Sequence, residues 1–330
     1  MSSFWKKKRV LVTGATGLVG SHLIEKLLTL DADVFAFVLE TPKTSLFAQK
    51  NFADHVSVIN GNLAVKDLIF QAVIEANPQI IIHLGAQTIV GRAFEDPLET
   101  FESNIQGTYF LLEAARLHAK NLIAIVVASS DKAYGTAKTL PYTEEFPLHG
   151  DGPYDVSKSC TDLLSQSYGT TYQMPVSIAR CGNIYGAGDI NWSRIVPGTF
   201  KSIFMNEQPI LRSDGTFLRD YIYVEDVVDA YLLLVEKSKD IKPGTAYNFS
   251  NDMAYTVNQI YREICQAAVG HYIEPLYLNS ARNEIHDQHL SSENAFKDFG
   301  WKSTSTLESG LKQTSLWYQA IINEIQIIND

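Results

Sequence analysis

The feature that most constrains the fold is a regular alternation of short apolar runs and longer segments of helical periodicity over the first 180 residues. Six runs rich in Val and Ile are predicted to be buried strands: Arg9–Thr13, Asp33–Leu39, Val56–Asn60, Ile80–Leu84, Leu122–Ser129 and Val176–Arg180. Helices are predicted between them, including Leu18–Leu30, Val65–Ala76, Thr100–Ala119 and Tyr154–Tyr172. Strands that alternate with helices form a parallel sheet covered on both faces, so we expect a doubly wound α/β architecture.

The rhythm changes in the second part of the 330-residue chain. A loop rich in Gly, Asn, Asp and Pro over residues 182–197 precedes a mixture of short helices and brief strands. Val224–Glu236 has the pattern of a helix that returns to the first domain, whereas Thr256–Val269 and Leu307–Asn323 are predicted helices of a smaller lobe. The predicted domains are a sheet domain of residues 1–180 with 221–248, and a mixed α/β lobe of residues 181–220 with 249–330.

Composition excludes several classes of protein. Twenty-seven basic against 37 acidic residues give a formal net charge of −10, which provides no general attraction for a nucleic acid or an anionic membrane. No apolar run approaches the ~20 residues that span a bilayer. Three cysteines without CxxC spacing suit a reducing compartment and argue against a disulfide framework. We therefore expect a cytoplasmic protein without nucleic-acid or membrane partners.

A glycine-rich turn follows the first predicted strand, where residues 13–20 read TGATGLVG. Glycines allow the backbone to turn tightly and approach a pyrophosphate, while the N-terminus of the next helix offers free N–H groups to the anion. Glu40, at the end of the second predicted strand, is placed to accept hydrogen bonds from an adenosine ribose and to repel a 2′-phosphate. The pattern predicts NAD as cofactor, bound by Gly14, Thr16, Gly17, Leu18, Val19, Gly20 and Glu40.

Two further segments follow predicted strands. Asn62 and Leu63 come after the third strand, and Leu84, Gly85, Ala86 and Gln87 come after the fourth. Ligands of open α/β sheets bind at the carboxyl ends of the strands, so we expect the first pair near the adenine and the second segment along the cofactor's ribose. The alternative for each segment is a plain turn at the end of a strand, and the alternative for Glu40 is a solvated loop acid.

Tyr154 and Lys158 are four residues apart, which places a phenol and an ammonium on one face of a helix that begins after Gly152-Pro153. A nearby ammonium favours the phenolate, so we expect Lys158 to lower the pKa of Tyr154 and make it a base for a sugar or alcohol hydroxyl. Such pairs also occur on solvated helices. The dinucleotide pattern, together with Ser129-Ser130 at the end of the preceding strand, favours the catalytic interpretation.

These features together give the chain its resemblance to the extended short-chain dehydrogenases/reductases, which act on nucleotide sugars on a Rossmann sheet. The motifs that carry it are the glycine turn, Leu84–Gln87, Asn104 with Gly107-Thr108, Tyr154/Lys158, Gly182–Gly186, Arg219–Tyr221 and Val224–Val227. The resemblance implies that Asn104, Tyr154 and Lys158 also contact NAD and that a nucleoside diphosphate hexose lies in the C-terminal lobe. It further implies a homodimer through a four-helix bundle of Thr100–Ala119 and Tyr154–Tyr172.

The segment Ser129–Lys132 narrows the expected reaction. Sugar 4-epimerases of this family usually carry a small, non-ionisable pair where Asp131 and Lys132 stand here. Nucleotide-sugar 4,6-dehydratases carry an ionisable pair, because they also expel a hydroxyl from C6. The Ser-Asp-Lys version is similar to that of the CDP-glucose 4,6-dehydratases, and residues 91–101 and 188–197 point the same way. Residues 218–223 are more similar to the general dehydratase and epimerase form.

The resemblance implies roles for five catalytic residues, Ser130, Asp131, Lys132, Tyr154 and Lys158. Tyr154, assisted by Lys158, takes the proton of the C4 hydroxyl while hydride passes to NAD, and Ser130 hydrogen-bonds that oxygen. Asp131 protonates the departing C6 hydroxyl, and hydride returns to C6. Lys132 stands where a glutamate base is usual. It acts either as a neutral amine of lowered pKa or as an electrostatic support for an enolate.

The same resemblance indicates residues that contact the substrate. Asn183, Arg194 and Arg219 fall at positions similar to pyrophosphate contacts, and arginine suits the task because its planar fork matches phosphate oxygens. The remaining candidates for substrate contact are Gln87, Ser130 and Arg282. His286-Asp287-Gln288-His289 invites a metal interpretation, but two histidines three apart without further ligands do not make a metal site, and none is predicted.

Two other functions compete with the dehydratase. One is an NAD-dependent nucleotide-sugar epimerase, whose product keeps its C6 hydroxyl. The other is a non-catalytic dinucleotide-binding sensor, since a fold does not by itself establish a reaction. The presence of Ser130, Asp131, Tyr154 and Lys158 together argues against the sensor, which has no need of all four.

Overall fold

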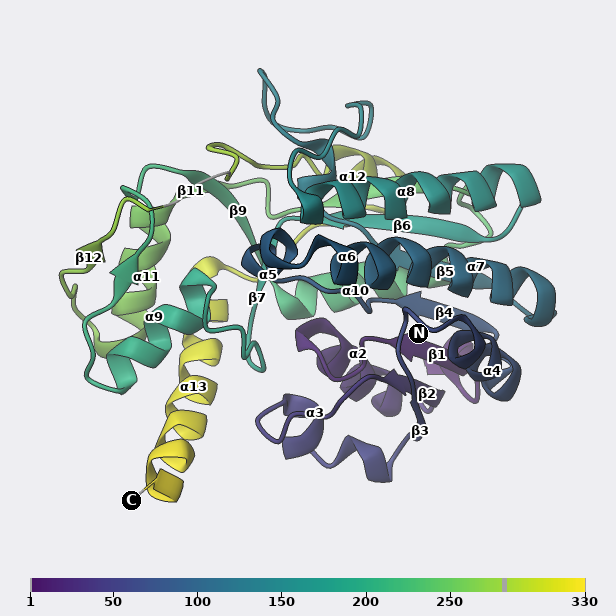
Figure 1. Ribbon diagram of the computed structural model, residues 1–330, viewed down its shortest axis with the longest axis horizontal. Coiled ribbons are helices and arrows are strands. Elements are labelled where there is room, and N and C mark those ends of the chain that lie inside the picture. The colour runs from purple at the N-terminus through teal and green to yellow at the C-terminus, as the bar shows by residue number, and fades with distance from the viewer. Residues whose placement is uncertain (1, 281–283, 330) are drawn as a thin grey trace.

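A seven-stranded parallel sheet forms the centre of the molecule (Figure 1), as the alternating pattern predicts. The computed structural model describes residues 2–280 and 284–329. The strand order is β10-β6-β5-β4-β1-β2-β3. The chain adds β2 and β3 on one side of β1 and the later strands on the other side, as in a doubly wound sheet. The strands are β1 (Arg9–Thr13), β2 (Asp33–Val38), β3 (Ser57–Asn60), β4 (Ile80–His83), β5 (Ala124–Ala128), β6 (Val176–Cys181) and β10 (Thr245–Phe249).

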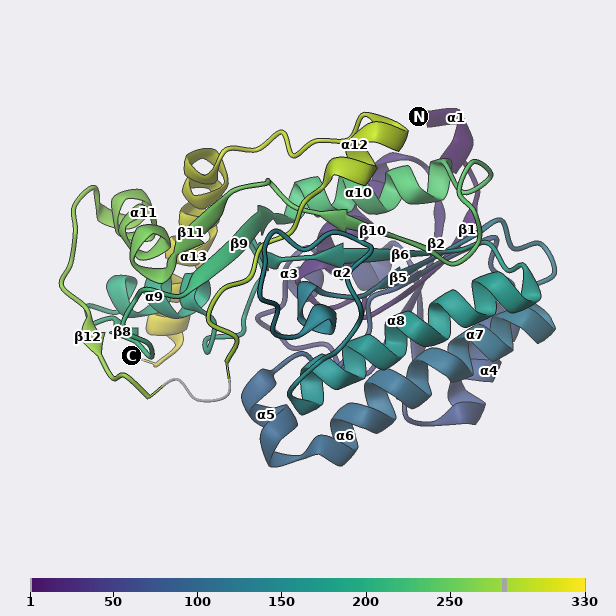
Figure 2. The ribbon, with the colours of Figure 1, turned by 90° about the horizontal axis from the view of Figure 1, so that it is seen from above.

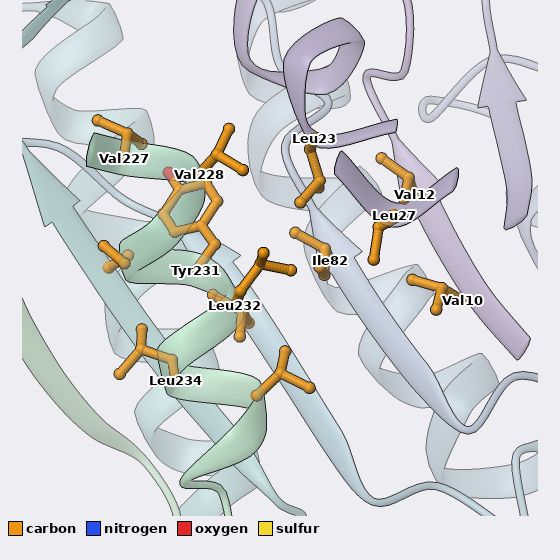
Figure 3. Packing of buried hydrophobic residues seen from close by; sticks show 14 of the residues in the cluster. Val10, Val12, Leu23, Leu27, Ile82, Val227, Val228, Tyr231, Leu232 and Leu234 are labelled. Carbon is orange, nitrogen blue, oxygen red and sulfur yellow. The ribbon is translucent and has the colours of Figure 1, made fainter. Parts of the chain in front are cut away.

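Both faces of this sheet are covered by helices. Along β1, Val10 and Val12 belong to one apolar core and Leu11 belongs to the other, as the two-residue period of a strand requires. Figure 3 shows the first core, in which Val10 and Val12 pack near α2 (Leu18–Thr29) and α10 (Val224–Glu236). The opposite face carries α4 (Lys66–Ala76), α7 (Gly107–His118) and α8 (Pro153–Tyr172), and Figure 2 shows α7 and α8 side by side.

The helix predicted over Thr100–Ala119 is present and contains a wider turn. It is divided into α6 (Pro97–Phe101), a π-helical turn over Glu102–Gln106, and α7. The wider turn contains Asn104, which is almost completely buried. Such a turn inserts an extra residue into a helix and is frequently found at functional sites. The periodicity of apolar residues did not reveal it, because the period on either side of the turn remains helical.

The C-terminal lobe contains two small sheets and three helices around its own apolar core. One sheet has the order β11-β9-β7, with β7 and β9 parallel and β9 and β11 antiparallel. The elements of the lobe are β7 (Asn183–Tyr185), β8 (Ile210–Leu211), β9 (Leu218–Tyr223), β11 (Ala254–Thr256), β12 (Leu276–Tyr277), α9 (Ile195–Phe204), α11 (Val257–Val269) and α13 (Leu307–Asn329). Phe200, Ile264 and Tyr318 join the three helices in the core.

The chain returns to the sheet domain twice, and the sequence predicted only the first return. After α10 and β10, the helix α12 (Glu293–Phe299) also packs on the sheet, whereas we expected it in the lobe. The Tyr247 hydroxyl donates to Asp298 Oδ2 at 2.8 Å, and the rings of Phe249 and Trp301 lie 4.8 Å apart. The amphipathic pattern of so short a helix does not specify which of two apolar surfaces it covers.

The remaining short elements connect these layers. They are α1 (Ser2–Trp5), α3 (Leu46–Gln49), α5 (Val90–Glu95) and 3₁₀ turns at Phe52–Asp54 and Asp131–Tyr134. Trp5 is buried, and its Nε1 donates to Glu236 Oε1 at 2.7 Å, which attaches the N-terminal segment to α10. Within residues 2–280 and 284–329, every helix is too short or too polar to cross a lipid bilayer.

Candidate active site

A cleft of about 1160 Å³ lies between the sheet domain and the C-terminal lobe. It follows the carboxyl ends of the strands, where ligands of doubly wound sheets bind. Its lining includes residues predicted for cofactor, catalysis and substrate. These are Gly14, Thr16, Gly17, Leu18, Val19, Gly20, Glu40, Asn62, Leu63, Leu84, Gly85, Ala86, Gln87, Ser130, Asp131, Lys132, Tyr154, Lys158, Asn183, Arg194 and Arg219. Arg282, the last substrate candidate, lies outside the described residues.

The glycine-rich turn has the shape that a dinucleotide requires. Gly14 has φ +68°, and a Cβ on Gly14 would lie 2.7 Å from Gly85 N. A Cβ on Gly20 would lie 2.2 Å from the Gly14 carbonyl oxygen, so α2 can approach the turn only with glycine there. Gly17 is the N-cap of α2 and has no side chain to bond the first N–H groups of this helix. These N–H groups therefore remain accessible to an anion in the cleft. This cradle fits the pyrophosphate of NAD.

Glu40 is exposed at the rim of the cleft, just beyond β2. The Thr16 hydroxyl donates to the Glu40 carbonyl oxygen at 3.0 Å, which ties the glycine turn to the segment after β2. The Glu40 carboxylate is therefore held near the turn, at the place where an adenosine ribose follows a pyrophosphate bound at α2.

A buried histidine fixes the segment Leu84–Gln87. His83 Nδ1 lies 2.7 Å from Thr13 Oγ1, which in turn accepts a hydrogen bond from Gly85 N at 3.0 Å. Burial, and to a smaller extent the charge of Lys158, lowers the pKa of His83 to about 3. His83 is thus neutral at physiological pH. The sequence did not single it out, because its position inside a strand resembles that of any core residue.

Asn104 does not line the cleft, contrary to the expectation that it contacts the cofactor. Its Oδ1 accepts a hydrogen bond from Gln87 N at 2.7 Å, and its Nδ2 donates to Gln87 O at 2.9 Å. Nδ2 also donates to Ser157 Oγ at 2.9 Å. The π-helical turn directs this side chain into the protein, so Asn104 acts on the cleft through Gln87 and α8.

Tyr154 and Lys158 lie on the first turns of α8, which begins at Pro153 with Gly152 as its cap. Lys158 Nζ donates to the Ala128 carbonyl oxygen at 2.9 Å, and burial lowers its pKa to about 8. Burial raises the pKa of Tyr154 to about 12, against opposing effects of Arg194 and the Ser130 hydroxyl. Contrary to the expectation that Lys158 lowers this pKa, desolvation dominates it, and the Lys158 ammonium donates to β5.

Asp131 and Lys132 begin the 3₁₀ turn that follows β5. The Ser130 hydroxyl donates to Asp131 Oδ1 at 2.9 Å and accepts a hydrogen bond from Lys132 N at 3.2 Å. Asp131 is 2% exposed, and its Oδ2 has no hydrogen-bond partner among the described residues. Lys132 Nζ donates to Gln288 Oε1. The ionisable pair is therefore organised at the cleft and differs from a charge pair in a solvated turn.

The sequence did not single out Asp155, which also lines the cleft. Its Oδ2 accepts a hydrogen bond from Gly152 N at 3.3 Å, so the sequence signal available for it was that of a helix cap. Burial raises the pKa of Asp155 to about 6, while Lys132 opposes this shift. Asp155 thus adds a second carboxyl group on the Lys132 side of the cleft.

The predicted phosphate contacts come from the lobe. Arg219 is 7% exposed and pairs with Glu284 at 3.4 Å, while its Nη1 donates to the His286 carbonyl oxygen at 2.7 Å. Arg194 is more exposed and pairs with Asp189 at 3.2 Å. Asn183 Nδ2 donates to the Asp220 carbonyl oxygen at 3.1 Å. Two further cations, Lys201 and Arg212, line the cleft and were not selected from the sequence.

The His286–His289 segment is tied to the substrate side of the cleft. His286 Nδ1 and Asp287 Oδ1 are 2.6 Å apart, and Asp287 Oδ1 also accepts a hydrogen bond from Leu218 N at 3.3 Å. Among the described residues, no group of three or more His, Cys, Asp or Glu side chains is arranged to hold a metal ion.

Comparison with known proteins places the chain among the dehydratases. The family model described as GDP-mannose 4,6-dehydratase matches residues 11–314. The CDP-glucose 4,6-dehydratase of Salmonella typhimurium is 28% identical over 338 residues, which cover 97% of this chain and 93% of that protein. A trifunctional protein of Arabidopsis thaliana, with UDP-glucose 4,6-dehydratase as one named activity, is 29% identical over 332 residues. That match covers 95% of this chain and 47% of the plant protein, so the chain spans about half of its length.

Solved structures agree with this placement. The dTDP-glucose 4,6-dehydratase of Bacillus anthracis in complex with NAD is 26% identical, with a TM-score of 0.82 over 94% of this chain and 96% of that one. NAD, the cofactor predicted from the sequence, is thus the one crystallised with this relative. The UDP-glucose 4-epimerase of Thermotoga maritima, at 24% identity and a TM-score of 0.85 over 94% and 98% of the chains, shares the fold. Because the family model extends from β1 into α13, the chain belongs to the GDP-mannose 4,6-dehydratase family of short-chain dehydrogenase-type nucleotide-sugar 4,6-dehydratases.

Proposed function

We propose that this protein is an NAD-dependent nucleotide-sugar 4,6-dehydratase that converts CDP-glucose to CDP-4-keto-6-deoxyglucose. The observation that carries the proposal is the placement of Asp131 and Lys132 in the cleft, beside Ser130 and across from Tyr154. An enzyme that only oxidises and reduces C4 has no use for a buried carboxyl group and an amine at this point. A dehydratase needs both an acid at C6 and a base at C5.

The cofactor site in this proposal consists of the glycine turn, Glu40 and the segment Leu84–Gln87. The N-terminus of α2 holds the pyrophosphate, Glu40 accepts the hydroxyls of the adenosine ribose, and Asn62 and Leu63 flank the adenine. Lys158, whose Nζ donates to the Ala128 carbonyl oxygen, would donate to the nicotinamide ribose. NAD, when bound, supplies hydride-transfer chemistry that takes hydride from C4 and returns it to C6.

Oxidation at C4 requires a base for the sugar hydroxyl. Tyr154 Oη receives this proton, and the Ser130 hydroxyl hydrogen-bonds the C4 oxygen. Burial raises the pKa of Tyr154 to about 12, and Arg194 and the Ser130 hydroxyl oppose this shift. The Lys158 ammonium, on the same face of α8, would favour the phenolate, because a positive charge within ~4–6 Å lowers the pKa of a phenol.

Elimination of water follows from the 4-ketone, which acidifies the proton at C5. Lys132 Nζ takes this proton while the Asp131 carboxyl group gives a proton to the C6 oxygen, which leaves as water. Lys132 then returns its proton to C5 as C6 is reduced, so the hexose loses one water in total. Burial lowers the pKa of Lys132 even though Asp131 opposes the shift, which supports the neutral-amine role over a purely electrostatic one.

CDP-glucose is the proposed substrate because the Ser130-Asp131-Lys132 segment resembles that of the CDP-glucose enzymes and a relative of that name matches along nearly its whole length. Arg194 and Arg219 are proposed to bind the diphosphate, with Asn183 beside them. Gln87 and Ser130 would contact the hexose, and Arg282 remains a proposed contact to the nucleotide.

The epimerase remains the second candidate, since an epimerase with this fold is among the similar structures. The proposal is tested by incubating the protein and NAD with CDP-, dTDP-, UDP- and GDP-hexoses and measuring product mass. We expect CDP-glucose to lose one water without accumulation of NADH. Isomerisation without a change in mass would favour the epimerase, and no reaction with any sugar would favour a non-catalytic sensor.

We further propose that two copies associate through α7 and α8. These helices form one outer layer of the molecule (Figure 2), and Leu117 and Leu163 are 44% and 52% exposed on them. Tyr172, at the end of α8, is also 52% exposed. Two such helices from each copy would form a four-helix bundle that buries these side chains.

A further inference from the structure

The segment from His286 to Leu290 runs behind the catalytic turn that contains Asp131 and Lys132. Its backbone is attached to β9, where Gln288 N donates to Leu218 O at 3.1 Å and Leu218 N donates to His286 O at 3.2 Å. It is attached to the segment after the catalytic turn as well, since Tyr142 N donates to His289 O at 2.9 Å. The segment is therefore held at both ends by backbone hydrogen bonds.

Gln288 is the residue of this segment that meets the catalytic turn. Its side chain is completely buried, and its Oε1 accepts a hydrogen bond from Lys132 Nζ, 156 residues away in the chain. Lys132 lines the cleft, whereas Gln288 does not. Its contact with Lys132 is therefore the link between Gln288 and the cleft on which the proposal rests.

We propose that Gln288 is a positioning residue that orients Lys132 Nζ toward C5 of the sugar and keeps the amine free of an additional negative charge. The proposal rests on the proposed function for the identity of the proton that Lys132 removes. The contact between the two side chains does not depend on it.

The orientation of the Gln288 amide supports this role. Its Nε2 is buried, and the Gln288 side chain also acts on the Tyr142 hydroxyl, where a hydrogen bond from the amide opposes the burial that raises the pKa of Tyr142 to about 12. A rotation of the amide that exchanged Oε1 and Nε2 would direct an N–H donor at the amine and remove the acceptor from Lys132. In the observed orientation the amide oxygen faces Lys132, and the amide nitrogen points away from it.

An amide is suited to this position because Lys132 already faces several charges. Asp131 on the same turn, Asp155 on α8 and Glu284 before the segment favour the ammonium, and Arg219 on β9 disfavours it. Burial outweighs these effects and lowers the pKa of Lys132. A fourth carboxylate in direct contact with Nζ would hold the proton, because an opposite charge at contact distance shifts a pKa by roughly 1–3 units. A neutral amide fixes the amine without that charge.

Two substitutions of Gln288 separate orientation from charge. In Gln288→Glu the contact is kept and a charge is added, so the pKa of Lys132 should rise and the acid limb of log kcat against pH should move up by about one unit or more. In Gln288→Leu the contact is lost, so kcat should fall by about 10²-fold with little change in KM, and no rise in the pKa of Lys132 is expected. Asp287→Asn is the matched control, since it removes a charge one residue away and keeps the acceptor for Leu218 N.

The pKa of Lys132 is measured without any sugar, from the pH dependence of its acetylation by trace acetic anhydride, followed by peptide mass spectrometry. A higher pKa in Gln288→Glu than in wild type and Asp287→Asn supports the proposal, even if no hexose is turned over. An unchanged pKa in Gln288→Glu overturns it. If this pKa rises while the limb of kcat stays in place, the contact is supported and the base role of Lys132 in the proposed function is refuted.

Discussion

Asp131 is the residue on which water loss depends in the proposed reaction. Its carboxyl group is buried, receives one hydrogen bond from Ser130 and has a second oxygen, Oδ2, without a partner among the described residues. A buried oxygen that lacks a protein partner at the edge of a cleft is free to meet a sugar hydroxyl. In the proposed reaction this oxygen would therefore be the one that faces the departing C6 hydroxyl.

Asp131→Asn should separate the two halves of the reaction. The amide keeps the size and the acceptor of the carboxyl group but has no proton to give, so oxidation at C4 should continue while water loss falls by about 10²- to 10⁴-fold. Stopped-flow absorbance would show reduced nicotinamide accumulating on the enzyme after CDP-glucose is added. Asp151→Asn is the control, because Asp151 does not line the cleft and its Oδ2 accepts a hydrogen bond from Thr136 N. Dehydration at a rate near that of wild type would remove Asp131 from the acid role.

The sequence located most of the site residues but not the contacts that tune them. Ser130, Asp131, Lys132, Tyr154 and Lys158 were predicted from local spacing and family resemblance, and all five line one cleft. Their protonation depends on burial and on distant partners, which no local pattern encodes. The raised pKa of Tyr154 and the contact of Lys132 with a residue 156 positions away are both consequences of tertiary packing.

At the scale of elements, the glycine turn couples the first strand to α2 and to the cofactor. The close contact of α2 with this turn depends on the absence of a side chain at Gly20. Because the same helix packs against α10 in the core of Figure 3, a displacement of α2 would reach both the pyrophosphate cradle and the core.

Gly20→Ala should therefore weaken both NAD binding and stability. Its Cβ would lie 2.2 Å from the Gly14 oxygen and 2.8 Å from Ala15 Cα, both backbone atoms that cannot move independently. Overpacking of this kind costs about 1–3 kcal/mol of unfolding free energy. Urea denaturation and calorimetric NAD titration measure the two effects. Gly91→Ala on α5 is the control, since its Cβ would meet nothing within 4 Å. Equal behaviour of the two variants would contradict this description of the turn.

Six of the seven strands of the sheet, β1 to β6, were predicted to within two residues at each end, because buried parallel strands produce continuous apolar runs that polar turns interrupt. The seventh strand, β10, was not predicted as a strand. The elements that differ from prediction are those decided by tertiary contacts. The helix over residues 100–119 widens into a π-helical turn where Asn104 points inward and holds Gln87. The position of α12 on the sheet depends on Tyr247 and Phe249, which a seven-residue amphipathic pattern does not identify.

For the molecule as a whole, the net charge of −10 must coexist with two bound diphosphates in the proposed reaction. Positive potential is supplied locally, by the N-terminus of α2 on one side of the cleft and by Arg194 and Arg219 on the other. The two-lobed shape brings these sources to a single cleft. A net negative charge over the whole chain is therefore compatible with the binding of two diphosphates in this cleft.

The proposed dimer through α7 and α8 can be tested by changing a side chain that it would bury. Leu163→Lys places a charge in the bundle that α7 and α8 would form, so it should convert a dimer to a monomer in size-exclusion chromatography with light scattering. Leu316→Lys on α13 is the matched control, because Leu316 is 57% exposed on a helix outside the proposed bundle and its substitution should leave the mass unchanged. A wild-type protein that elutes as a monomer would refute the dimer.

In the proposed reaction the hydrogen on C4 is transferred to C6 and the hexose loses one water. CDP-glucose that carries deuterium at C4 reports directly on this transfer. Product mass and deuterium NMR would be measured after reaction with the protein and catalytic NAD. We expect a product lighter by one water that retains the deuterium, now bound to C6. A product of unchanged mass with deuterium still at C4 would contradict it and identify an epimerase.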